Sequence, residues 1–312
     1  MIGTKLIEEF VQSVALSHQV EGHSRISCLL LASPESGKTT IANKSTLSKH
    51  VVPVVFMTGK SVIREVKENP RLEFMLFNDL TVIRAMSSTA SNFLVTTLNQ
   101  FTQNERGKVG FAGKKTAGIE RPIGIIGCMP FKTFSDKRSS WREFGFISRM
   151  LIFSYAYADE IVARIKDSID DGSHVKKKTA EPLPKITKKI DVKTTEHIIR
   201  QVRNIADSKS KELGQLGIRI LANYHCLVKA HALLMGRTTV TADDIAFLRA
   251  VDRHVSVKEC PTLLVTPEHE EVRQWRKGKQ SERSKNRTLD RESRKGIRSL
   301  NHVISTRQGQ RR

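Results

Sequence analysis

Short apolar runs alternate with stretches of helical spacing along the first half of the chain. The runs, each short enough for one strand, cover residues 25–32, 51–57, 73–77, 123–129 and 150–155. Between them, residues 39–48 and 87–103 have the composition and spacing of helices. Strands separated by helices predict a parallel sheet covered on both faces, so we expect an α/β fold in this half.

The second half has helical spacing only, over residues 194–208, 213–235 and 241–254. In the middle segment one apolar stripe recurs every three or four residues and predicts a single buried face, formed by Leu213, Leu216, Ile220, Tyr224, Leu227, His231 and Leu234. Thr241 and Asp244 have the spacing of a capping box at the start of the last helix. We therefore expect a small all-helical domain.

A proline-containing, highly charged stretch separates the two halves. It indicates a linker, and the predicted organisation is an α/β core over 1–168, a linker over 169–193, a helical domain over 194–256 and a tail over 257–312.

The formal net charge of the 312-residue chain is +21. Residues 273–312 carry 14 Lys and Arg against 3 Asp and Glu, so 14 − 3 = +11 of this charge lies in the tail. The tail has few apolar residues and is expected to be disordered in isolation. It is either a solvating segment or, as we favour, an arm that binds nucleic acid through its phosphates.

Several classes of protein are not expected. No apolar run approaches the roughly 18 residues of a membrane-spanning helix, and Glu8 and Glu9 lie where a secretory signal would be apolar. The four cysteines are isolated from one another, which favours neither a disulfide framework nor a zinc site. These features predict a cytoplasmic protein that does not bind membranes.

The strongest chemical signal follows the first apolar run. It matches the phosphate-binding pattern G-x-x-x-x-G-K-[ST], with Ala32 replacing the first glycine, and comprises Ser33, Pro34, Glu35, Ser36, Gly37, Lys38, Thr39 and Thr40. In such a loop the backbone N–H groups surround a phosphate and Lys38 reaches the β- and γ-phosphates, while the Thr39 hydroxyl coordinates Mg²⁺. The cofactors expected are ATP and Mg²⁺.

A P-loop ATPase also needs an acidic group at the tip of a neighbouring strand. The apolar run at 74–77 is followed by Asn78 and Asp79. In one arrangement Asn78 faces the metal and Asp79 orients the attacking water. In the other Asp79 holds the metal and no base is evident, since Leu80 follows. The sequence leaves both open, and either predicts slow hydrolysis.

Three further segments, in this order behind the loop, resemble the AAA+ ATPases, and especially the minichromosome maintenance (MCM) helicase branch. Gly145-Phe-Ile-Ser-Arg149-Met is similar to the arginine-finger segment. The stretch from Gly217 through Arg219 resembles the second sensor helix, and residues 236–245 resemble the end of the lid. The resemblance implies a three-layer P-loop core followed by a small helical lid. It also implies that Arg149 reaches a neighbouring subunit's site and that Arg219 contacts the γ-phosphate from the lid.

Met129 departs from this family, in addition to Ala32 and Asn78. The first sensor, normally a polar Asn or Thr, corresponds to Met129, which cannot orient a water molecule.

A further basic segment is typical of proteins that bind nucleic acid. Short apolar steps flank Gly113-Lys114-Lys115, which predicts a β-hairpin with two exposed cations that would contact phosphates; a flexible basic loop is the alternative.

The leading hypothesis is an oligomeric AAA+ ATPase that couples ATP to the handling of DNA, as a helicase or loader in replication or a related process. The resemblance implies that the oligomer is a ring. The alternatives are a weakly hydrolysing nucleotide-dependent switch and a protein remodeller similar to the MoxR-like chaperones.

Overall fold

The computed structural model describes residues 4–55, 58–103, 107–108, 118–119, 121–171, 183–184, 186 and 188–263. They belong to one compact unit, which spans residues 1–263. The predicted basic tail beyond this unit lies outside the described residues, as does the tip of the predicted hairpin with Lys114 and Lys115.

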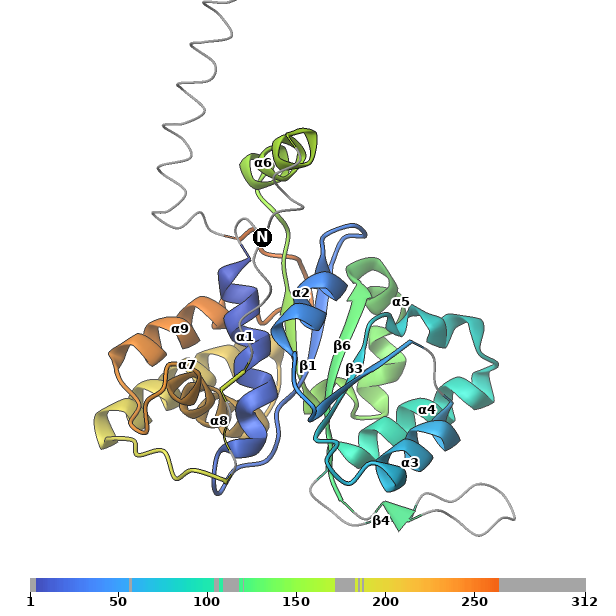
Figure 1. Cartoon of the computed structure of the whole chain (residues 1–312), viewed down its shortest axis with the longest axis horizontal. Coiled ribbons are helices and arrows are strands. Elements are labelled where there is room, and N and C mark those ends of the chain that lie inside the picture. The colour runs from blue at the N-terminus through green and yellow to red at the C-terminus, as the bar shows by residue number, and fades with distance from the viewer. Residues whose placement is uncertain are drawn as a thin grey trace, which may run out of the picture. The chain divides into compact units, whose positions relative to one another are not determined.

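A five-stranded, all-parallel sheet occupies the centre of the unit (Figure 1), in the order β2-β3-β6-β1-β7. Its strands are β1 (Ser27–Ala32), β2 (Val51–Val54), β3 (Phe74–Phe77), β6 (Gly124–Pro130) and β7 (Met150–Ser154). Each corresponds to one predicted apolar run, which confirms the α/β class. β1 lies between β6 and β7, so the strand that precedes the phosphate-binding pattern is central in the sheet.

Helices cover both faces of this sheet. The helices of the described chain are α1 (Lys5–Leu16), α2 (Lys38–Ser45), α3 (Gly59–Glu68), α4 (Ser88–Phe101), α5 (Phe131–Glu143), α6 (Asp159–Asp170), α7 (Glu196–Leu213), α8 (Ile218–Leu234) and α9 (Ala242–Asp252). Of these, α6 lies beyond the end of the sheet and covers neither face (Figure 1). Short 3-10 turns span Ser17–Gln19, Leu80–Ala85 and Ile147–Arg149.

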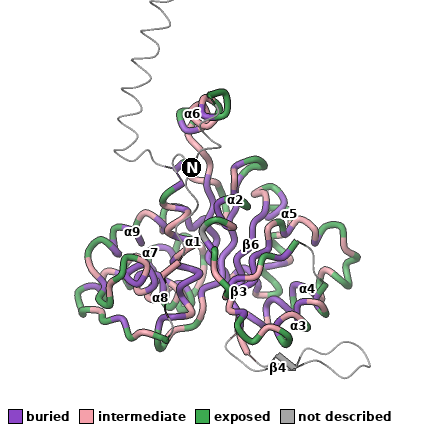
Figure 2. Tube along the Cα trace, in the orientation of Figure 1, coloured by how far each residue is buried: buried purple, intermediate pink, exposed green. Residues whose placement is uncertain are grey.

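Alternate residues along each strand face opposite layers, as a pleated sheet requires. In β1, Cys28 and Leu30 belong to the hydrophobic cluster that includes α1, α2 and α7–α9. Leu29 and Leu31 belong to the second cluster, with α3, α4 and α5. Figure 2 shows the consequence: β1, β3 and β7 are buried along their length, whereas the edge strand β2 is only partly buried. Strands buried on both faces are continuous apolar runs, which is why the sequence predicted them well.

The pattern analysis did not assign α1, α3, α5 and α6. α1 carries a clear helical signal in Ile7, Phe10, Val11 and Val14, whose side chains are fully buried. This helix packs against both α2 and α8.

α1 joins the helical half of the chain to the sheet. Its apolar residues, the sheet residues facing them and the buried residues of α7–α9 form one continuous cluster. The domain boundaries drawn from the sequence remain a prediction, but in this structure the helices after residue 194 do not have a hydrophobic core of their own.

The predicted middle helix begins later than expected, and one member of its stripe is not buried. Gly214 and Gly217 adopt positive φ angles of 63° and 80°, which end α7 and delay α8 to Ile218. Leu216 lies between these glycines and is 94% exposed. The prediction that Leu216 is buried was therefore wrong, because the periodicity continued across a helix break. The predicted capping box of Thr241 and Asp244 is confirmed.

The base of the predicted hairpin is present. β4 (Gly107–Lys108) pairs with β5 (Gly118–Ile119) in antiparallel register. The chain continues from β5 toward the amino end of β6, so the hairpin leaves the sheet at the end opposite the carboxyl ends of the strands.

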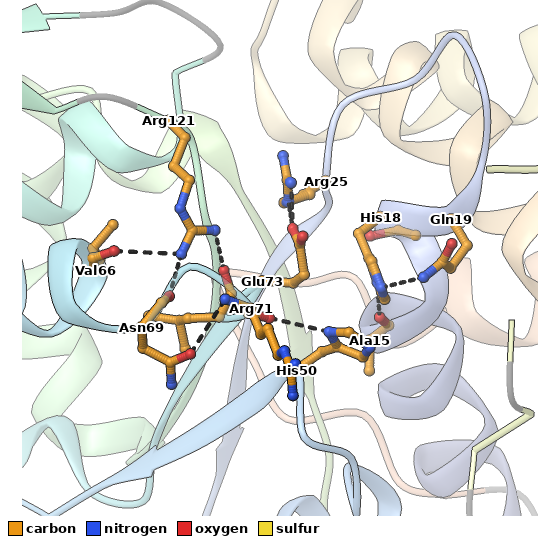
Figure 3. Close-up of polar contacts among 12 residues, drawn as sticks. Ala15, His18, Gln19, Arg25, His50, Val66, Asn69, Arg71, Glu73 and Arg121 are labelled. Atoms are coloured by element: carbon orange, nitrogen blue, oxygen red, sulfur yellow. Dashed lines mark hydrogen bonds and ion pairs between the residues drawn. The ribbon is translucent and has the colours of Figure 1, made fainter. Parts of the chain in front are cut away.

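Ion pairs and backbone contacts fix the amino end of the sheet (Figure 3). Arg25 Nε donates to Glu73 Oε2 at 2.7 Å, which joins the segment before β1 to the segment before β3. The guanidinium of Arg121 donates to the carbonyl oxygens of Val66, Asn69 and Leu72, where a cation also opposes the negative end of the α3 dipole. These two arginines therefore stabilise the folded chain.

Within the described residues, no helix has the length and apolar character needed to cross a bilayer.

The packing of β3 against β6 generates a test of the fold. A Cβ added at Gly124 would overlap the ring of Phe74, its register partner. We expect Gly124→Ala to lower the free energy of unfolding by about 2 kcal/mol or more, because a close-packed core has no room for the methyl group. Chemical denaturation measures this. Adding Phe74→Leu should recover part of the loss, and an additive second loss would contradict the overlap.

Candidate active site

The loop that leaves β1 has the backbone of a phosphate-binding turn. Gly37 is left-handed, with φ 74° and ψ 11°, and is the N-cap of α2. Glu35 also has a positive φ, of 61°, a conformation that costs a non-glycine residue about 1–2 kcal/mol. No side chain caps α2, and the first N–H groups of a helix have no acceptor within it. The start of α2 therefore provides N–H donors and a positive dipole end for an anion.

The ammonium group of Lys38 donates hydrogen bonds to three oxygen atoms of this loop. Its Nζ donates to the carbonyl oxygens of Ser33 at 2.6 Å and Ala32 at 3.2 Å, and to Ser36 Oγ at 3.1 Å. The residue is only 8% exposed, and burial lowers the pKa of its ammonium group. An anionic ligand beside Nζ would counteract this loss of solvation.

Two tyrosines that the sequence analysis missed support the loop from β7. The hydroxyls of Tyr155 and Tyr157 both donate to the carbonyl oxygen of Ser36, at 3.2 and 2.9 Å. Burial raises the pKa of both, that of Tyr157 to about 12, so both remain donors at neutral pH. In the sequence, only their position could have indicated this role. They follow the carboxyl end of β7, which pairs with β1 through Leu31 and Ser154.

Asn78 contacts α2 directly, and Asp79 does not. The Thr39 hydroxyl donates to the Asn78 carbonyl oxygen at 2.9 Å, and Asn43 Nδ2 donates to Asn78 Oδ1 at 2.9 Å. Asp79 is exposed and accepts from the backbone N–H and the hydroxyl of Thr81, at 2.8 and 2.7 Å. Of the two arrangements open from the sequence, these contacts favour the one with Asn78 beside Thr39, the predicted metal ligand, and with Asp79 one residue further out.

The position of the first sensor is apolar. β6 lies between β1 and β3, and its carboxyl end carries Met129, which pairs with Leu31 and is 1% exposed. To orient an attacking water molecule, a polar side chain at residue 129 would have to point toward the loop after β1. Met129 instead packs in the cluster with Leu31, α4 and α5.

The two predicted arginines lie together, at the other end of the sheet. Arg149 precedes Met150, which pairs with Ser27 at the amino end of β1. Its Nη1 donates to the Gly145 carbonyl oxygen at 2.6 Å. Arg219 is exposed and donates to Ser148 Oγ at 2.8 Å, so the two guanidinium groups converge on one short turn.

The length of β1 separates these arginines from the loop. A strand rises about 3.3 Å per residue, so the six residues of β1 span about 20 Å. Neither arginine is brought to the loop of its own chain.

The loop itself offers few ligands for a metal. In the parts of the chain that the structure describes, no three His, Cys, Asp or Glu side chains gather as a metal site. The Thr39 hydroxyl and the Asn78 amide are neutral oxygen donors of the kind that Mg²⁺ accepts when substrate phosphates supply most of the charge. The residues present therefore fit Mg²⁺ carried by a nucleotide rather than a resident metal ion.

No protein-family model matches this chain, and no curated protein matches it. The comparisons therefore assign this chain to no family.

The contacts of Asn78 generate a test. We expect Asn78→Asp to tighten the binding of Mg²⁺ in the presence of an ATP analogue by roughly tenfold, because a carboxylate replaces a neutral amide beside Thr39. Titration of Mg²⁺ monitored by calorimetry measures it. Asp79→Asn is the matched control and should change Mg²⁺ affinity much less. A larger effect of the control would place Asp79 at the metal.

Proposed function

We propose that this protein is an oligomeric P-loop ATPase of the AAA+ type, similar to the MCM helicase branch, that couples ATP binding and hydrolysis to the handling of DNA. The observation that carries the proposal is the contact between Thr39 and Asn78. It joins the tip of β3 to the start of α2, so that the predicted phosphate-binding loop and the polar residues Asn78 and Asp79 lie at one site.

The residues of the loop have distinct tasks in this proposal. The N–H groups of residues 33 and 35–40 surround the phosphates, because Pro34 has no N–H, and Lys38 leaves its contacts with the loop carbonyl oxygens to bind the β- and γ-phosphates. Thr39 contacts the Mg²⁺ that accompanies the nucleotide, with Asn78 as its neighbour. Asp79 orients the attacking water. The bonds from Thr81 fix its carboxylate but also occupy part of its capacity to accept hydrogen bonds.

The arginines support assembly of several copies. Because Arg149 and Arg219 lie at the amino end of the sheet, they can act on a nucleotide only in a neighbouring copy. Apolar residues beside them favour such a contact, since Leu216 is 94% and Ile218 74% exposed. Exposed apolar side chains next to each other typically mark an interaction surface. A head-to-tail contact of this kind closes into a ring if its rotation permits.

Charge supports nucleic acid as the partner. The net charge of +21 favours a polyanion, and the basic tail and the hairpin with Lys114 and Lys115 are the proposed contacts with DNA phosphates.

Removal of the Lys38 ammonium tests the site. We expect Lys38→Ala to weaken ATP binding at least about tenfold and to abolish turnover, because charge-assisted hydrogen bonds to phosphate contribute about 1.5–3 kcal/mol. Filter binding and phosphate release measure these effects. Lys44→Ala, an exposed lysine of the same helix, is the control and should behave as wild type. ATP turnover that survives Lys38→Ala would remove the proposal.

Removal of Arg149 tests the contact between copies. We expect Arg149→Ala to retain ATP binding but to lower turnover by about 10³-fold, the scale of an arginine finger. Arg142→Ala, in the exposed last turn of α5, is the control.

A mixture of the two inactive variants separates action between copies from action within one. Subunits with Lys38→Ala retain Arg149, and subunits with Arg149→Ala retain the loop, so a mixed oligomer contains intact sites. We expect the mixture to regain turnover that neither variant shows alone. Its absence, with mixed oligomers demonstrated, would show that Arg149 does not act across a subunit contact.

Two observations favour a second candidate, a nucleotide-dependent switch or loader that hydrolyses ATP slowly. Met129 is buried where a polar sensor would orient water, and a neutral Asn78 faces the metal position. A switch would bind ATP and change its affinity for DNA, with turnover that DNA does not stimulate.

A further inference from the structure

A depression on the helical half of the unit is lined by donors of hydrogen bonds and positive charge. Its volume is about 560 Å³, and its polar lining includes His23, Asp191, Lys193, Thr194, His225 and Lys229. These residues come from three separate parts of the chain: the segment before β1, the segment before α7, and α8. We call this depression the basic groove.

The lysines of the basic groove have no structural partner. Lys193 and Lys229 make no side-chain hydrogen bond or ion pair with any residue in the described part of the chain, even though Asp191 lines the same groove. Arg25 and Arg121 behave differently, because Glu73 and three backbone carbonyls engage them (Figure 3). The groove therefore contains positive charge that the fold does not use.

The two histidines lie close to Lys229. Burial lowers the pKa of His23 to about 4 and also lowers that of His225, and Lys229 lowers both further. At neutral pH both rings are therefore uncharged, and each carries one N–H donor. Lysine ammonium groups and imidazole N–H groups on one surface form a set of donors for an anion.

Thr194 also lines the groove, but its hydroxyl oxygen is buried and makes no hydrogen bond to any residue that the structure describes. The donors that the groove offers to a ligand are therefore those of its lysines and histidines.

The basic groove lies away from the candidate active site. His23 precedes β1, whose amino end begins at Ser27, and the phosphate-binding loop follows the carboxyl end of the same strand. A ligand in the groove would therefore not compete with ATP for its binding site.

We propose that the basic groove is a second phosphate-binding surface, which takes the sugar-phosphate backbone of a nucleic acid without reading its bases. The choice of a polynucleotide rests on the proposed function, and the groove chemistry itself requires a repeating anion. A phosphodiester fits better than an acidic peptide because every phosphate offers two acceptor oxygens to ammonium and imidazole donors, with no apolar side chain to accommodate. Among the described residues that line the groove there is no Phe, Tyr or Trp to stack on a base, so contacts with the backbone dominate.

The experiment compares two double variants of the full chain. Lys193→Ala/Lys229→Ala removes both groove lysines, and Lys166→Ala/Lys211→Ala removes two exposed lysines of α6 and α7 outside the groove. Fluorescence anisotropy measures their affinity for labelled oligothymidylate and for a duplex across a salt titration. ATP binding and thermal unfolding report whether each variant is folded.

We expect the groove variant to bind oligothymidylate about tenfold more weakly at low salt. The slope of log K against log salt should fall by about 1.4, since each neutralised phosphate of a single strand contributes about 0.7. ATP binding and the unfolding temperature should match the wild type, and the control variant should keep the wild-type slope.

Three results would overturn the inference. Equal losses in the two double variants would show that total charge, and not the groove, governs affinity. An unchanged groove variant would show that the nucleic acid binds elsewhere. A groove variant that loses binding to poly-aspartate but keeps binding to both oligonucleotides would assign the groove to an acidic protein segment.

These outcomes are separable from failure of the proposed function. If the wild type binds no oligonucleotide at any salt concentration, the nucleic-acid part of the proposed function fails and the groove assignment fails with it. If the wild type binds oligonucleotide and hydrolyses ATP, only the comparison of the double variants decides the groove. If a variant unfolds, Lys193→Gln/Lys229→Gln, which keeps most of each side chain, replaces it in the same comparison.

Discussion

The parallel alignment of β3, β6, β1 and β7 is the constraint on which the rest of the structure depends. Parallel strands place all their carboxyl ends at one edge, and buried strands allow no other register without exposing apolar side chains. The loop after β1, the polar tip of β3 and the tyrosines after β7 therefore meet at one end. The turn with Arg149 precedes a strand, so the same constraint places it at the other end. The proposed assembly of several copies rests on this separation, and not on any property of the loop.

The candidate site is held together largely by hydrogen bonds to backbone oxygen atoms. Thr39 contacts the Asn78 carbonyl, the tyrosines contact the Ser36 carbonyl, and Lys38 contacts Ala32 and Ser33. Ala32, which replaces the first glycine of the pattern, is the buried last residue of β1. It contacts Lys38 through its backbone carbonyl oxygen, which any residue at this position would supply.

α1 gives the helical half of the chain a direct connection to the sheet. One hydrophobic cluster extends from β1 and α2 through α1 to α7–α9, and interiors of this density transmit displacement rather than absorb it. In the proposed function, a shift of α2 on nucleotide binding would be passed to α8. This helix carries His225 and Lys229 of the basic groove, and Arg219 near its amino end. The continuous cluster thus offers a route between the nucleotide and both contact surfaces.

The sequence by itself determined the α/β class, the five central strands, the glycine-containing turn between β1 and α2, the base of the hairpin and the capping box of α9. These depend on local pattern, since buried parallel strands are apolar throughout and a glycine-lysine turn has a fixed spacing. Local periodicity failed at Leu216, because two left-handed glycines interrupt the helix that the spacing continues across. Only the tertiary structure decided which of Asn78 and Asp79 faces Thr39, that Tyr155 and Tyr157 support the loop, and that Lys193 and Lys229 share a groove. Each of these contacts is between residues that are far apart in the chain. The order of the strands in the sheet brings these residues together, and no single segment of the sequence determines that order.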